Sequence, residues 1–208
     1  MATSTLTAAT AMPAAAERPA PEAAADLGLA ALPLLHLLRL VSPALPVGAY
    51  SYSRGLEWAV QAGWVGDAAQ AGAWIAGLLR HAVARLDVPL LARMMAAWRL
   101  EDAQAVLAWS RRLLAMREAA EFQAEERQQG AALARLLASL GEARARPWQE
   151  HPACTWVGMF ALAAVWSEVP ERAAALGYLW AWAENQALAA VKLVPLGQTA
   201  GQSILAGL

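Results

Sequence analysis

The chain has 208 residues, of which 59% are hydrophobic and only 16% charged, against roughly 25% charged in an average globular domain. Its formal net charge is −1, so the chain has no excess of positive charge to attract the phosphates of a nucleic acid, and nucleic acid is not an expected partner. The single Cys154 cannot form an internal disulfide, and the longest near-continuous apolar run, Ala153 to Trp166, is too short to span a bilayer. We therefore expect a cytoplasmic protein with a large core and no membrane span.

Residues 1–26 consist mainly of Ala, Pro, Thr and Ser and show no amphipathic period, which predicts a disordered tail. A transit peptide is the alternative, because such leaders are rich in serine and poor in acid, but Arg18 is the only basic residue there. No apolar core of a signal peptide precedes the domain. We expect one folded domain over residues 27–208.

Apolar periodicity, capping residues and prolines divide this domain into helices. They predict helices over Pro33 to Val41, Ser53 to Gly63, Asp67 to about His81, Asp87 to about Leu100, Asp102 to Leu140 with one break, Pro152 to Trp166, Pro170 to Val191, and a last one after Pro195 and Gly197. Asp67 and Gln70 resemble a capping box, and Asp87 before Pro89 resembles an N-cap followed by a first-turn proline. No window alternates as a strand does, so the predicted fold is all-α, a single compact multi-helix bundle.

The stretch SPALPVGAYSYSRGLEW, Ser42 to Trp58, combines two prolines, two glycines and three aromatic residues. A plain connection needs only a few turn residues, so this composition indicates a shaped surface. Trp180 and Trp182 lie two residues apart on a predicted helix and cannot both face one side of the core. One of them is expected to face a neighbouring chain, because tryptophan is common among interface anchors.

Motifs for catalysis and for a cofactor are missing from the sequence. The only lysine, Lys192, is not part of a phosphate-binding loop, and His36, His81 and His151 lie far apart. His151 and Cys154 could supply at most two metal ligands, and a buried structural thiol is the favoured interpretation. We therefore expect no enzyme activity, no metal site and no intrinsic cofactor.

Charged residues gather on the long predicted helix between Asp102 and Leu140. The cluster comprises Arg117, Glu118, Glu121, Glu125, Glu126 and Arg127. Such a run favours a solvated helix face over a partner surface. Lys192 either complements the carboxyl end of its helix or selects an acidic partner residue, and spacing alone favours the first interpretation.

Several ordered motifs resemble those of the urease accessory protein UreF family, from about Leu34 to the C-terminus. They are LLRLVSPALPVGAYSYSRGLEWAVQAGWV, LDVPLLARM, the pair Arg117 and Glu118 followed by GAALARLL, and GYLWAWAENQALAAVKLVPLGQTAGQ. Ala49 and Arg54 depart mildly from the family pattern, which commonly has Gly and Gln there. Family members also usually continue beyond the position of Leu208, through a segment that takes part in binding the UreD-type partner.

The resemblance implies an all-helical cytoplasmic component of nickel insertion into urease, without a catalytic site of its own. Family members dimerise, bind UreD (also called UreH) and the GTPase UreG, and engage apo-urease, so that nickel and GTP are handled by the partner complex. The residues that match the family's motif positions are expected to bind partners: Tyr50, Ser53, Glu57, Asp87, Lys192, Pro195, Gly197 and Gln198. Of these, Glu57, Asp87 and Lys192 fall on positions linked to contact with the GTPase or to its control.

An alternative of another class is an α-helical enzyme or small-ligand-binding protein with a pocket near Tyr50, Tyr52 and Glu57. A buried Glu57 with a raised pKa, and no partner-facing surface, would favour it, because perturbed acids in clefts are candidates for functional sites.

Overall fold

The computed structural model describes residues 29–49 and 52–208, so the predicted tail over residues 1–26 and the candidate Tyr50 lie outside the described residues. The described helices are α1 (Ala31–Val41), α2 (Leu56–Gln61), α3 (Ala68–Leu78), η3 (Leu79–Asp87), α4 (Val88–Arg99), α5 (Ala103–Ala115), α6 (Ala120–Ser139), η4 (Ala143–Trp148), α7 (Trp156–Trp166), α8 (Glu171–Leu193) and α9 (Gln198–Ala206). No strand occurs in the part of the chain that the structure describes, and the predicted all-α fold is confirmed.

Short-range signals place several helix ends. Asp67 Oδ1 accepts the backbone N–H of Gln70 at 2.8 Å, and Asp102 Oδ1 accepts that of Ala105 at 2.9 Å, so both residues cap the helices that they were predicted to open. The predicted capping box at Asp67 is only half formed, because Gln70 Oε1 accepts the N–H of Gly66 at 2.8 Å and not that of Asp67. Gly141 follows α6 with a φ of 104°, a conformation that glycine adopts without steric cost. The predicted break in the long charged stretch is also present, between α5 and α6.

The predicted N-cap at Asp87 is wrong. Helices α3, η3 and α4 follow one another without interruption, and Asp87 is itself helical, with φ −69° and ψ −46° and no cap hydrogen bond. Segment η3 is a π-helix, in which each N–H bonds the carbonyl five residues back, as Val88 does with Val83. The Asp87 carboxylate bonds other elements instead of its own helix end, and Pro89 stands in a continuing helix.

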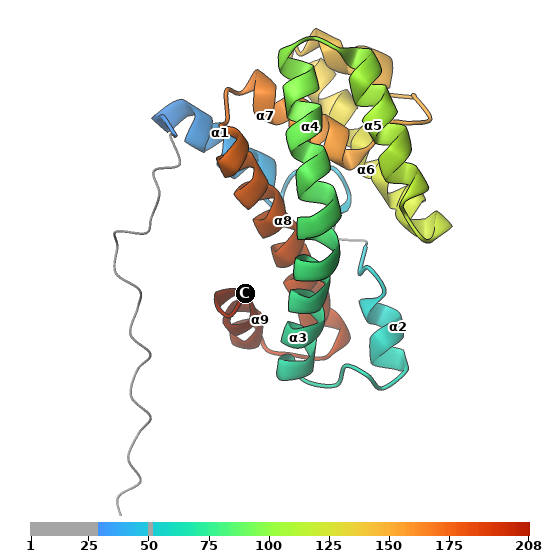
Figure 1. Cartoon of the computed structure of the whole chain (residues 1–208). Helices are drawn as coiled ribbons and strands as arrows, with labels where there is room; N and C mark the ends of the chain where they lie inside the picture. The colour runs from blue at the N-terminus through green and yellow to red at the C-terminus, as the bar shows by residue number, and fades with distance from the viewer. Residues whose placement is uncertain (1–28, 50–51) are drawn as a thin grey trace, which may run out of the picture.

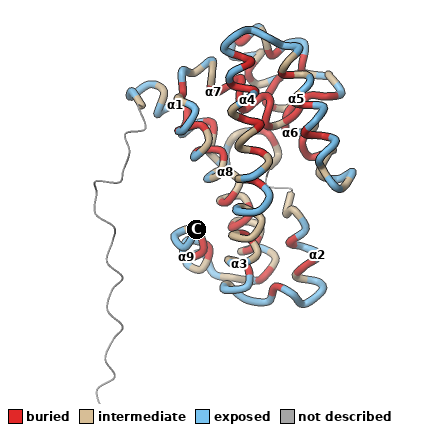
Figure 2. The backbone as a smooth tube through the Cα atoms, viewed as in Figure 1, coloured by how far each residue is buried: buried red, intermediate tan, exposed pale blue. Residues whose placement is uncertain are grey.

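The molecule has two lobes, each with its own hydrophobic cluster (Figures 1 and 2). The larger lobe consists of α1, α4, α5, α6, η4, α7 and the first part of α8, and α7 at its centre is largely buried, as predicted. The smaller lobe consists of α2, α3, α9 and the end of α8, packed through Leu56, Ile75 and Ala190. The continuous α3–η3–α4 helix and α8 run from one lobe into the other (Figure 1).

Glycine allows two of the closest helix contacts. A Cβ on Gly130 of α6 would lie 2.5 Å from the carbonyl carbon of Thr155, just before α7, and one on Gly177 of α8 would lie 2.6 Å from Leu37 Cδ1 of α1.

On α8, Trp180 is 47% exposed whereas Trp182 packs against both clusters, so the prediction that these two rings cannot share one core side is confirmed.

Candidate partner-binding site and buried charge network

The chain makes a tight left-handed turn where the predicted surface stretch enters α2. Arg54 has a φ of 50° and Gly55 a φ of 83°. Gly55 occupies the N-cap position, while Ser53 Oγ accepts the N–H of Glu57 at 3.4 Å, so Ser53 contributes a long bond to the helix that it was predicted to cap. The turn buries Leu56 and leaves Glu57 exposed.

Ion pairs hold Arg54 in this turn, although a left-handed conformation is unfavourable for a residue with a Cβ. Its Nε lies 2.7 Å from Glu125 Oε2, and its Nη2 lies 3.6 Å from Glu126 Oε1. The guanidinium also stands over the ring of Phe122, 5.4 Å from the ring centre. The surface stretch is therefore fastened to α6 by a side chain that the sequence reading treated only as a mild departure from the family pattern.

Arg117 connects this contact to the π-helix and to α8. One of its nitrogens, Nη2, bonds Glu126 Oε1 and also Asp87 Oδ2, the latter at 2.9 Å. Tyr178 donates its hydroxyl proton to the same Asp87 oxygen at 2.9 Å, and Glu126 Oε2 accepts the N–H of Trp156 at 3.1 Å. We call the set of ionisable side chains the charge network; its members are Arg54, Asp87, Arg117, Glu125, Glu126 and Tyr178.

Burial and pairing act against each other inside the charge network. Burial raises the pKa of Glu125, and the nearby Arg54 opposes that rise without cancelling it. Burial alone would lower the pKa of Arg117, but Glu126 and Asp87 together raise it above its ordinary value, so Arg117 remains a cation. Burial, reinforced by the charge of Asp87, raises the pKa of Tyr178, which keeps its hydroxyl protonated as a donor.

The predicted solvated face is wrong for Arg117, Glu125 and Glu126, whose side chains are at most 7% exposed. The sequence held a signal that could have revealed this. Glu126, Gly130, Leu133 and Leu137 recur at helical spacing, so the apolar stripe of α6 extends back to Glu126. Of the other cluster members, Glu118 and Glu121 are exposed as predicted.

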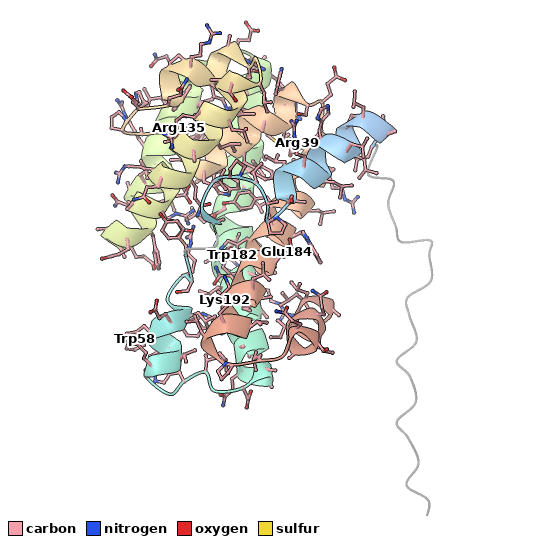
Figure 3. The ribbon with its side chains drawn as sticks, turned by 180° about the vertical axis from the view of Figure 1, so that it is seen from behind. Arg39, Trp58, Arg135, Trp182, Glu184 and Lys192 are labelled. Carbon is pink, nitrogen blue, oxygen red and sulfur yellow. The ribbon has the colours of Figure 1, made fainter. Side chains whose placement is uncertain are left out.

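Most of the predicted partner-binding residues come together on the smaller lobe. Glu57 lies on α2 and Lys192 in the last turn of α8, and both are exposed. The turn after α8 and the start of α9 carry three more exposed candidates, Pro195, Gly197 and Gln198. Their buried neighbours, Leu56 of the first motif and Val194 of the last, belong to one hydrophobic cluster. Figure 3 shows Lys192 and Trp58 on this same lobe.

Asp87 does not belong to this exposed group, because it is completely buried in the charge network. Any effect of Asp87 on a partner would have to pass through its contacts with Arg117 and Tyr178. Its assignment as a partner-binding residue stays a prediction, and in this conformation its role would be to position other groups.

Cys154 is 1% exposed, and burial raises the pKa of its thiol to about 12. The thiolate is the reactive and metal-binding form, so a thiol held protonated in the core is a poor nucleophile and a poor ligand. His151 turns its Nδ1 to the backbone, accepting the N–H of Ala153 at 3.1 Å. Both observations favour the structural interpretation of this pair.

We expect Cys154 in the folded protein to react with an aromatic disulfide reagent at pH 8 more than about a hundredfold more slowly than in the unfolded chain, because little thiolate forms and access is blocked. Because the chain has no other cysteine, the absorbance change reports this thiol alone. The same protein in denaturant is the control. Equal rates in the two samples would contradict the buried, protonated thiol.

A model of the UreF family matches residues 65–208, well over half of the chain. The chain belongs to the UreF family. Urease accessory protein UreF of Alkalilimnicola ehrlichii is 53% identical over 170 residues, covering 82% of this chain and 75% of that protein. The UreF proteins of Pseudomonas putida strain W619 and of Azoarcus sp. are 48% and 49% identical, and each match covers 78% of the relative.

Membership of the UreF family confirms the resemblance found in the motifs. The matched region begins at Val65, the last residue of the first motif, and contains the three later motifs. It therefore includes the candidates Asp87, Lys192, Pro195, Gly197 and Gln198 but neither Ser53 nor Glu57. Within the described residues, no helix combines the length and apolarity needed to cross a membrane.

Proposed function

We propose that this UreF-family chain is a non-catalytic scaffold of urease maturation in the cytoplasm. In this role it dimerises, binds UreD/UreH, and recruits and regulates the GTPase UreG, so that GTP hydrolysis is coupled to nickel delivery to apo-urease. The chain needs no intrinsic cofactor for this, because nickel is the cargo and GTP belongs to the partner. The observation that carries the proposal is that exposed candidates from the first and the last family motif lie on the same lobe: Glu57 from the first, and Lys192, Pro195, Gly197 and Gln198 from the last.

The chemistry of the smaller lobe supports a protein partner. Glu57 and Lys192 offer opposite charges, which orient a partner and reject like-charged surfaces. Trp58 and Trp64 pack edge to face with ring centres 4.6 Å apart, yet remain 56% and 59% exposed. Exposed tryptophans that pack edge to face are suited to act as anchors in an interface, because they bury a large area at a small cost in side-chain entropy.

The enzyme alternative receives no support from Glu57. It required a buried acid in a cleft, whereas Glu57 is exposed on α2.

We expect Lys192→Ala and Glu57→Ala to reduce nickel-dependent urease activation at least about tenfold while leaving the fold intact, because an interface charge matters more for binding than a surface charge does for stability. The measurement is urease activity in a reconstituted mixture of apo-urease, UreD, UreG, nickel, GTP and each variant. Circular dichroism melting of each variant verifies the fold.

Arg172→Ala is the matched control, because Arg172 is also exposed on α8 but lies at its opposite end. It should activate urease like the original chain. Failure of the original chain to co-elute with UreD and UreG from a sizing column would overturn the scaffold proposal. Full activation by both alanine variants would remove Glu57 and Lys192 from the interface. A large fall in melting temperature for Lys192→Ala would instead assign that residue to stabilising the helix end.

A further inference from the structure

An open pocket of about 380 Å³ lies on the larger lobe, between the second half of α5, the first half of α6 and the loop before α7. We call it the α5–α6 pocket. Three of its lining residues can carry a positive charge, one from each of these segments: Arg111, Arg127 and His151. No aspartate or glutamate of the described residues lines it. The ionisable groups of the pocket are therefore all basic.

Two hydrogen bonds hold the Arg127 guanidinium at the pocket. Its Nε donates to the Pro152 carbonyl at 2.9 Å, and its Nη2 donates to Gln123 Oε1 at 3.3 Å. Both acceptors belong to residues that line the pocket, so the guanidinium lies at its edge. A guanidinium has further N–H donors in the same rigid plane, and these remain for a ligand. Because Arg127 is already positioned, binding to it costs little additional ordering of the side chain.

The two arginines of the pocket are not neutralised. Among the described residues, no carboxylate lies within ion-pair distance of Arg111 or Arg127. Glu126 precedes Arg127 in the sequence, but it is bonded to Arg117 inside the charge network. Three exposed carboxylates nearby in the sequence do not line the pocket: Glu118, Glu121 and Glu150. An anion in the pocket would therefore be attracted without having to displace an existing ion pair.

His151 adds a third donor. Its Nδ1 accepts the N–H of Ala153 at 3.1 Å, so the proton of the uncharged imidazole is on Nε2. The ring packs beside Trp148, with the two ring centres 5.3 Å apart, which restricts its rotation. Donors thus come from three separate segments of the chain. A carboxylate has two oxygens in one plane, whereas the oxygens of a phosphate point in several directions, so a phosphate matches such donors better.

We propose that the α5–α6 pocket binds the phosphate group of a phosphate monoester. Arg111 and Arg127 donate to the phosphate oxygens and balance their charge, and His151 Nε2 donates to a further oxygen. Leu114 and Pro152, which line the same pocket, contact the group that is esterified to the phosphate. The volume lies at the lower end of the roughly 300 to 1,000 Å³ of small-molecule sites, which limits that group to about a single ring. The site is separate from the exposed candidates on the smaller lobe and does not depend on the scaffold function.

Phenyl phosphate, inorganic phosphate and benzoate are the probes, titrated into the full-length chain alone at low ionic strength and followed by calorimetry and ligand-observed NMR. We expect saturable binding of phenyl phosphate in the millimolar range, because the pocket is open to water and salt screens its charges. Inorganic phosphate lacks the ring and should bind at least about threefold more weakly. Benzoate has the ring but a planar group of lower charge, and should bind at least about fivefold more weakly.

Two of these results would contradict the proposal in different ways. No saturable binding of phenyl phosphate, or benzoate binding equally well, overturns the phosphate site. Equal affinities of phenyl phosphate and inorganic phosphate overturn the monoester and leave free phosphate as the ligand.

Substitutions test the contacts against a neighbouring charge. Arg111→Gln and Arg127→Gln should each weaken phenyl phosphate binding at least about fivefold, because each removes a charge-assisted hydrogen bond. Arg112→Gln is the matched control, because Arg112 is also exposed on α5 but does not line the pocket. It changes the net charge equally and should weaken binding less than about twofold. Equal losses in all three variants would indicate general attraction to a basic surface and overturn the site. If Arg127→Gln does not fold, the comparison of Arg111→Gln with Arg112→Gln still decides.

Discussion

Arg117→Met is expected to lower the free energy of unfolding by about 3 to 5 kcal/mol. Arg117 is the cation between Asp87 and Glu126, and both carboxylates have side chains that are 0% exposed. Removing one partner of a buried ion pair leaves a charge without compensation in a medium of low polarity, which is why the loss exceeds that of a surface pair. Urea unfolding at pH 7, followed by circular dichroism, gives the difference between the two proteins.

Arg99→Met is the matched control, because Arg99 pairs with Glu171 at 3.6 Å on the surface, where both side chains are about half exposed. Its expected effect is at most about 1 kcal/mol. Adding Glu126→Gln to Arg117→Met should recover part of the loss, since the double variant buries one charge fewer. Equal, small effects of Arg117→Met and Arg99→Met would show that the charge network does not stabilise the fold.

Gly130→Ala is expected to destabilise the protein by about 3 kcal/mol, at the upper end of the usual range for overpacking. The added Cβ would lie 2.5 Å from the Thr155 carbonyl carbon, 2.8 Å from its oxygen and 2.9 Å from Trp156 N. All three are backbone atoms, so no side chain can turn away to make room. Relief would require α6 to move away from the start of α7, which would loosen the centre of the larger lobe.

Gly77→Ala provides the opposite case with the same chemical change. Gly77 lies in α3, and a Cβ there would meet nothing within 4 Å. Alanine has the higher helix propensity, so this variant should be more stable by about 0.5 to 1 kcal/mol. Thermal and urea unfolding of both variants would test the pair, and a shift of the same sign in both would contradict the role assigned to Gly130.

The features that sequence reasoning predicted well depend on neighbours along the chain. The caps at Asp67 and Asp102 need only a carboxylate and an N–H three residues later. Asp87 stands in an equally good local pattern, but its partners Arg117 and Tyr178 are 30 and 91 residues away. A rule that uses only neighbouring residues cannot reveal contacts of that separation. In the folded protein the Asp87 carboxylate makes these contacts instead of capping a helix.

The candidate site shows the same division. The motif resemblance identified Glu57 and Lys192, and both proved to be exposed on one lobe. Arg54 was passed over because a difference from a family pattern says nothing about where a side chain points, and its pairing with Glu125 depends on how α6 packs.

The lobes are joined by two helices, α8 and the uninterrupted α3–η3–α4, and this limits how a complex can use them (Figure 1). Where a loop joins two domains, relative motion is the usual expectation. Here a rotation of the smaller lobe would have to bend both helices at the same level. A protein that binds Glu57 and Lys192 therefore fixes the direction of the larger lobe as well, so every other binding surface of the chain is set at a defined angle to the first partner.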